Sequence, residues 1–322
     1  MANVLSSYGL DVDRLPIVAS ETMPKQLIIT GIPGSGKSWY VKNTILKGVS
    51  KTNYVRVVFY DGYDYTDFIG GFRPTYLDGQ ASMSFIKGPF LEILCKALKN
   101  PIEQFYVVIE EINIGNAPLI FGDFFQLLDR NNETNDSDYG WSMYTLHNDD
   151  IKQSLAEDGV NIGHGLRLPS NFNIIATMNS ADQNTYPLDT AFKRRFSIKY
   201  CINEWDKIDE NITFFGKSWK HCCKIINNYI INDLGLPDDM RIGCFFVNCN
   251  DNVEQKIVSY LYDDIAYPNG FVNEIFSYEK SKEDLFHEIE KYNISKFSQD
   301  VEEFTLYSIF NERLAEKLSG NE

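Results

Sequence analysis

The chain has 322 residues, 43% of them hydrophobic and 14% aromatic, and a formal net charge of −15 at pH 7. This is enough for two domains or one large core, and no apolar run approaches the roughly 18 residues that a membrane-spanning helix needs. The acidic balance argues against general nucleic-acid binding, which depends on lysine and arginine. Six scattered cysteines without a C-x-x-C pair, and no export signal, predict reduced thiols in a cytoplasmic protein that does not contact a membrane.

The elements expected along the chain divide it into three parts. Residues 1–24 form a lead-in, residues 25–200 alternate apolar strands with helices as in a parallel α/β sheet, and residues 201–322 have helical periodicity. We expect strands at 26–30, 56–60, 105–109, 172–176 and 196–200, and a hairpin pairing 141–146 with 165–168. We expect helices at 37–46, 90–98, 119–129, 188–193, 218–233, 253–267 and 282–318.

The segment Gly31–Ser38 reads G-I-P-G-S-G-K-S and matches the phosphate-binding pattern G-x-x-x-x-G-K-[ST] between an expected strand and an expected helix. Glycines allow backbone N–H groups to turn toward phosphate oxygens, and the helix N-terminus adds partial positive charge. Lys37 is expected to reach the β- and γ-phosphates and Ser38 to bind Mg²⁺. The expected nucleotide contacts are Gly31, Pro33, Gly34, Ser35, Gly36, Lys37, Ser38 and Trp39.

A second expected strand, Tyr106–Ile109, ends in the paired acids Glu110 and Glu111. By itself this pattern is commonly a strand end followed by a solvated turn. Beside a phosphate-binding loop, the first acid can hold Mg²⁺ through water and the second can polarise the attacking water. We therefore assign Glu110 to the metal and Glu111 to the water.

Two further polar segments follow. Asn179 comes at the end of an expected strand, where it can contact the γ-phosphate or its attacking water, although asparagine also favours Asx turns.

Arg194 and Arg195 lie at the end of an expected helix, where cations commonly stabilise a helix C-terminus. Alternatively, one of these arginines completes the nucleotide site of a neighbouring subunit.

Taken in order, these segments resemble the AAA+ GTPase subunit of McrBC-type restriction systems. The similar stretches, beyond the phosphate loop, are 64–74, 109–116, 121–123, 127–130, 177–183, 188–196 and 241–243. The resemblance places Asp182 in the family's M-N-x-x-D-R signature and an arginine finger in 188–196. It also places Arg241 in the sensor-2 region of a helical lid.

The resemblance implies an AAA+ P-loop NTPase core of class α/β with a smaller C-terminal helical lid. It implies that the nucleotide is GTP rather than ATP and that it binds with Mg²⁺. It also implies a homo-oligomeric ring, a hexamer, and a McrC-like nuclease partner that stimulates turnover in restriction and phage defence. Gln183 departs from the family's arginine and Glu110 from its aspartate. Because the chain begins about 24 residues before the first expected strand, the family's N-terminal DNA-reading domain is not expected, and DNA would be engaged through the partner.

Two other functions remain open from the residues. One is an ATP-driven remodelling ATPase of the MoxR or dynein-related type, which binding of GTP compared with ATP would distinguish. The other is a nucleotide-dependent assembly scaffold that does not hydrolyse, which a turnover assay with and without the partner nuclease would identify.

Overall fold

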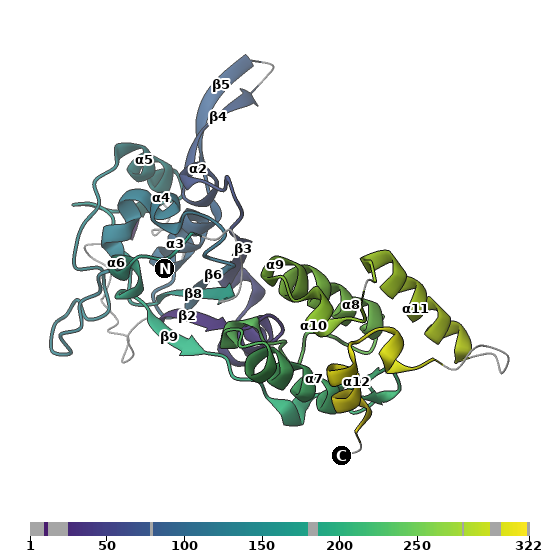
Figure 1. Cartoon of the computed structure of the whole chain (residues 1–322). Helices are drawn as coiled ribbons and strands as arrows, with labels where there is room; N and C mark the ends of the chain where they lie inside the picture. Colours follow the sequence, from purple (N-terminus) through teal and green to yellow (C-terminus); the bar gives the residue numbers. More distant parts are fainter. Residues whose placement is uncertain are drawn as a thin grey trace. The chain divides into compact units, whose positions relative to one another are not determined.

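The computed structural model describes residues 10–11, 25–77, 80–179, 186–278, 280–296 and 304–320 (Figure 1). Contacts divide the chain into two compact units: Met1–Thr30 with Lys37–Tyr200, and Gly31–Gly36 with Cys201–Glu322. Each unit contains its own cluster of buried hydrophobic side chains. None of the helices in the described ranges is long and apolar enough to cross a membrane.

The first unit is built on a five-stranded sheet with the order β3-β6-β8-β2-β9. The ladders β3/β6, β6/β8 and β2/β9 are parallel, which confirms the predicted α/β class. Its strands are β2 (Gln26–Gly31), β3 (Tyr54–Val58), β6 (Phe105–Glu110), β8 (Phe172–Asn179) and β9 (Ser197–Tyr200). The carboxyl ends of parallel strands meet at one edge of a sheet, so the polar residues that follow β2, β6 and β8 are brought to that edge.

Aromatic packing holds helix α3 (Pro89–Lys99) in the core of this unit. Proline at its first position suits a helix start, because its missing N–H would have no partner there. The ring of Phe90 is fully buried and lies within 6.0 Å, centroid to centroid, of four other rings. These rings belong to Phe68, Phe121, Phe124 and Phe172.

An antiparallel hairpin that we did not expect projects from the first unit (Figure 1), and Lys87 at its end donates to the Ser154 hydroxyl at 3.2 Å. It consists of β4 (Gly70–Leu77) and β5 (Gln80–Lys87) and follows the short helix α2 (Tyr65–Phe68). The available signal was the dipeptide Asp78-Gly79, which favours two-residue hairpin turns.

Several expected elements differ in the structure. The helix expected at 119–129 divides into α4 (Ala117–Phe121) and the 3₁₀ helix η4 (Gly122–Leu128), because Gly122 has a φ of +52° that an α-helix does not accept. The hairpin expected at 141–146 and 165–168 is reduced to a single bridge between Leu146 and Leu166. The remaining helices and short strands of this unit are α1 (Lys37–Tyr40), η2 (Val41–Ile45), η3 (Lys51–Asn53), α5 (Asp149–Glu157), α6 (Thr190–Lys193), β1 (Leu10–Asp11) and β7 (Val160–Asn161).

The second unit is mainly helical. Its α-helices are α7 (Trp219–Asn228), α8 (Val253–Tyr260), α9 (Tyr267–Asn269), α10 (Val272–Ile275), α11 (Lys282–Ser295) and α12 (Glu312–Ser319). The π-type turns η6 (Tyr229–Asp233) and η8 (Leu261–Ala266) continue α7 and α8. The 3₁₀ turns are η5 (Trp205–Lys207), η7 (Asp238–Met240) and η9 (Leu306–Ser308). The short strand β10 (Thr213–Phe214) pairs with β11 (Lys217–Ser218). The single helix expected at 282–318 is wrong, since α11 ends at Ser295 and α12 begins only at Glu312.

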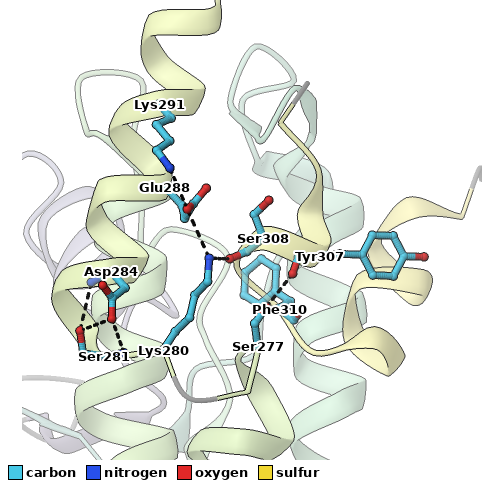
Figure 2. Close-up of polar contacts among 9 residues, drawn as sticks. All are labelled: Ser277, Lys280, Ser281, Asp284, Glu288, Lys291, Tyr307, Ser308 and Phe310. Carbon is cyan, nitrogen blue, oxygen red and sulfur yellow. Dashed lines mark hydrogen bonds and ion pairs between the residues drawn. The ribbon is translucent and has the colours of Figure 1, made fainter. Parts of the chain in front are cut away.

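Side-chain contacts tie the start of α11 to the turn η9 (Figure 2). The ammonium of Lys280 donates to the Ser308 carbonyl at 2.6 Å and pairs with Glu288 at 3.4 Å. The Ser277 hydroxyl donates to the Tyr307 carbonyl at 2.6 Å. These bonds connect two segments that the interrupted helix leaves separate in the sequence.

Candidate nucleotide-binding site

The phosphate-binding loop follows β2 directly and leads into α1. The loop turns sharply at Ser35, whose N–H donates to the Ile32 carbonyl at 3.1 Å. Gly34 and Gly36 have φ angles of +74° and +95°, which residues with a Cβ rarely adopt. The two glycines are therefore required by the backbone path of the loop.

Side chains of the loop differ in exposure. Lys37 is 7% exposed and begins α1, whereas Trp39 in the same helix is 53% exposed. The Ser35 hydroxyl is buried and has no hydrogen-bond partner among the described residues. A buried hydroxyl without a partner is costly, and a phosphate oxygen would satisfy it.

Residues Gly31–Gly36 of the loop belong by their contacts to the second unit. Within that unit, the Gly243 N–H donates to the Pro33 carbonyl at 2.8 Å, and a Cβ on Gly243 would lie 2.1 Å from the Gly34 carbonyl carbon. Arg241, two residues earlier, is 40% exposed and pairs with Asp238 at 3.0 Å. The segment around Arg241 thus contacts the loop through main-chain atoms.

Glu110 ends β6 and lies against the hydroxyl of Ser38, which donates to its Oε2 atom at 3.1 Å. The Thr177 hydroxyl of β8 also donates to Oε2, at 2.5 Å. The Oε1 atom is buried and accepts no hydrogen bond among the described residues, although the guanidinium of Arg56 forms an ion pair with it at 3.0 Å. The strand order brings Ser38, Glu110 and Thr177 together from three separate segments.

These oxygen donors fit Mg²⁺, which prefers carboxylate and hydroxyl ligands and retains several waters. The Ser38 hydroxyl and the Glu110 carboxylate are adjacent, and the buried Oε1 atom has unused acceptor capacity. Ser38 and Glu110 are therefore the residues that would hold the ion, directly or through water.

Glu111 follows the strand with a φ of +53°, a left-handed conformation that is uncommon for a residue with a side chain. Its carboxylate Oε1 accepts a hydrogen bond from the Asn179 amide at 3.0 Å, and its N–H donates to the Thr177 hydroxyl at 3.3 Å. Asn179 is held in turn through its carbonyl, which accepts from the Asn113 amide at 3.2 Å. Backbone strain of this kind is concentrated at functional sites.

The two arginines at the end of α6 have different surroundings. Arg195 pairs with Asp129 at 2.6 Å, lies over the ring of Phe125 at 4.1 Å, and has a side chain only 9% exposed. The side chain of Arg194 is exposed. Both precede β9, so they lie at the amino end of the parallel sheet, opposite the edge that carries Glu110.

The structure therefore brings together Ser38 with Glu110 and Glu111 with Asn179, and it separates both arginines from these pairs. Asp182 and Gln183 lie outside the described residues. Sequence reasoning assigned no role to Thr177 or Arg56. Both contacts depend on which strands are neighbours, and the only signal in the sequence was a polar residue within each apolar strand.

Comparison with known proteins identifies the family of the chain. Residues 26–196 match the family model of the AAA domain, dynein-related subfamily. The component YdiS of the type II restriction enzyme BsuMI from Bacillus subtilis (strain 168) is 36% identical over 291 residues, which cover 78% of this chain and 82% of YdiS. The EcoKMcrB subunit of the type IV methyl-directed restriction enzyme from Escherichia coli (strain K12) is 27% identical over 179 residues, which cover 55% of this chain and 35% of that subunit.

Among solved structures, a protein from Cytophaga hutchinsonii superposes with a TM-score of 0.31 at 19% identity, covering 59% of this chain and 44% of that one. A TM-score this low does not identify a shared fold, so the family assignment rests on the family model and the match to YdiS. The chain has a parallel sheet, a phosphate-binding loop after β2 and paired acids at the end of β6. By its matches it belongs to the AAA+ P-loop NTPase family and, within it, to the McrB-like components of restriction systems.

Proposed function

We propose that this chain hydrolyses a nucleoside triphosphate, with GTP preferred, as the ring-forming motor subunit of a restriction system. The main observation is the pair of contacts at the carboxyl edge of the sheet, Ser38 with Glu110 and Asn179 with Glu111. Each of the two acids has its own polar partner, as expected if they perform different tasks.

In this proposal Lys37 binds the β- and γ-phosphates, and the loop N–H groups surround the phosphate oxygens. Ser38 and Glu110 hold Mg²⁺, which neutralises charge on the triphosphate when it is bound. Glu111 orients and polarises the attacking water, and Asn179 fixes the Glu111 carboxylate while it does so. Trp39 and Arg241 are proposed to contact the nucleotide, and Asp182 is proposed to belong to the same site.

The arginine position supports a site shared between subunits. Arg194 lies at the amino end of the sheet and cannot reach the acids at the carboxyl edge of its own chain, because Gln26–Gly31 alone spans roughly 17 Å at 3.3 Å per residue. We propose that it acts on the nucleotide of a neighbouring subunit in a homo-oligomeric ring, a hexamer by family resemblance. Arg195 is instead occupied by Asp129.

The remaining parts of the proposal rest on resemblance to McrBC-type systems. They are a core at 25–200, a helical lid at 201–322, a preference for GTP, and stimulation by a McrC-like nuclease that engages DNA. An ATP-driven remodelling activity is the second candidate, supported by the match to the dynein-related subfamily.

Calorimetric titration with GTP and with ATP, each in Mg²⁺, tests the proposal. We expect tighter binding of GTP, and we expect Lys37→Ala to weaken binding by about 10- to 100-fold, since hydrogen bonds to charged groups contribute about 1.5–3 kcal/mol. Lys47→Ala, which removes an exposed lysine soon after the same helix, is the matched control. Equal affinity of wild type and Lys37→Ala would contradict the loop assignment, and tighter ATP binding would favour the remodelling ATPase.

A further inference from the structure

An arginine on the edge strand of the sheet contacts the proposed metal carboxylate. Strand β3 pairs in parallel with β6, with Arg56 opposite Val108 and Val58 opposite Glu110. Since side chains alternate along a strand, Arg56 and Glu110 lie on the same face of the sheet. The Arg56 Nη1 atom is 3.0 Å from Glu110 Oε1, and the two side chains are 36% and 11% exposed.

The two oxygens of Glu110 thus have different partners. Oε2 accepts hydrogen bonds from the hydroxyls of Ser38 and Thr177, whereas Oε1 faces only the Arg56 charge and accepts no aligned hydrogen bond among the described residues. An ion pair without hydrogen-bond alignment leaves the lone pairs of Oε1 available to another ligand. The Glu110 carboxylate is thus held at Oε2 by two hydroxyls and at Oε1 by the charge of Arg56.

A glutamate needs this orientation more than an aspartate does. It has one more methylene and one more rotatable bond, so fixing its side chain in one conformation costs more rotamer entropy. An ion pair at Oε1 already limits that freedom before any ligand binds.

We propose that Arg56 is a positioning residue: it fixes the Glu110 carboxylate beside Ser38, so that Mg²⁺ meets a preorganised ligand. This inference rests on the proposed function, because it takes Glu110 as the metal carboxylate. Arg56 acts through Glu110 and does not itself contact the nucleotide. Groups that orient metal ligands typically change metal affinity by 10- to 100-fold when they are removed.

The test measures Mg²⁺-dependent nucleotide binding without turnover. A fluorescent, non-hydrolysable GTP analogue is titrated in EDTA and at increasing Mg²⁺. For Arg56→Gln we expect the Mg²⁺ concentration for half-maximal enhancement to rise roughly tenfold, while affinity in EDTA stays unchanged. Arg56→Lys keeps the charge and should recover part of the effect. Arg73→Gln removes an arginine–carboxylate pair elsewhere in the first unit, 3.0 Å from Asp67, and should behave as wild type.

Repeating Arg56→Gln in a Glu110→Asp protein distinguishes positioning of the Glu110 carboxylate from a general effect of the Arg56 charge on the metal site. The shorter carboxylate cannot keep the Arg56 contact and the Ser38 contact together, so adding Arg56→Gln there should change the Mg²⁺ requirement by less than about twofold. An unchanged or lower Mg²⁺ requirement in Arg56→Gln alone would overturn the inference, and so would an equal effect in both backgrounds. Absence of nucleotide binding by the wild-type protein would instead contradict the proposed function.

Discussion

Glu110 and Glu111 are adjacent in the sequence but have separate surroundings in the structure. Glu110 completes a buried strand and contacts the hydroxyls of Ser38 and Thr177. Glu111 leaves the strand in a left-handed conformation, and its side chain accepts from Asn179. The backbone change between the two residues thus directs neighbouring carboxylates to different partners, which supports their assignment to different tasks.

The first prediction at this scale concerns Glu111→Gln. Nucleotide binding should be retained, because the phosphate contacts remain, and turnover should fall by about 10²- to 10⁴-fold because the general base is lost. Phosphate release under saturating GTP, alongside a binding titration, measures both quantities. Glu110→Gln is the matched variant and should raise the Mg²⁺ requirement. If Glu110→Gln lost turnover at all Mg²⁺ concentrations while Glu111→Gln kept it, the two roles would be exchanged.

Cysteine reactivity gives a second prediction. Burial raises the pKa of the Cys222 thiol to about 12 and that of Cys244 to about 11, whereas Cys249 is exposed. The thiolate is the reactive form, so maleimide at neutral pH should label Cys249 first and leave Cys222, Cys223 and Cys244 unlabelled until the protein unfolds. Mass spectrometry of timed samples, with Cys249→Ser as control, measures this. Early labelling of the three buried thiols would contradict the packing of the second unit.

At the scale of elements, the sheet was largely predictable and its surroundings were not. Apolar runs located all five strands within three residues at each end. The signal was clearest for β6 and β8, which are buried along most of their length and therefore continuously hydrophobic. Ser38 and Glu110, which we assigned to Mg²⁺ from two separate motifs, are in contact in the structure. Helix ends and interruptions were less predictable, as the change to a 3₁₀ helix at Gly122 shows. Contacts made by Thr177 and Arg56 required the strand order, which no local pattern supplies.

Phe90 provides a prediction for the core of the first unit. Its buried ring packs against four others, so Phe90→Ala should lower the free energy of unfolding by about 3–5 kcal/mol through lost burial and a cavity. Leu119→Ala, at a position that is 71% exposed, is the control and should change it by less than about 0.5 kcal/mol. Urea denaturation measures both variants. Equal effects would contradict the arrangement of this aromatic cluster.

At the scale of the whole molecule, the two edges of the sheet have different roles in the proposal. The carboxyl edge carries Ser38, Glu110 and Glu111, and the amino edge carries Arg194. Arg195 beside it is fixed by Asp129, so Arg195→Ala should mainly reduce stability, whereas Arg194→Ala should leave folding intact and reduce turnover. A ring would bring the amino edge of one subunit to the carboxyl edge of the next.

The measurement that tests this shared site most directly is GTP turnover in mixtures of Arg194→Ala and Glu111→Gln subunits. Each variant alone should be inactive, since every interface lacks either the arginine or the base. Mixed rings should recover activity, because some interfaces then join an intact Glu111 to an intact Arg194 of the neighbouring subunit. Lys193→Ala, which removes the exposed neighbouring cation, should remain active alone. No recovery in mixtures whose co-assembly and folding have been verified would contradict an arginine acting between subunits.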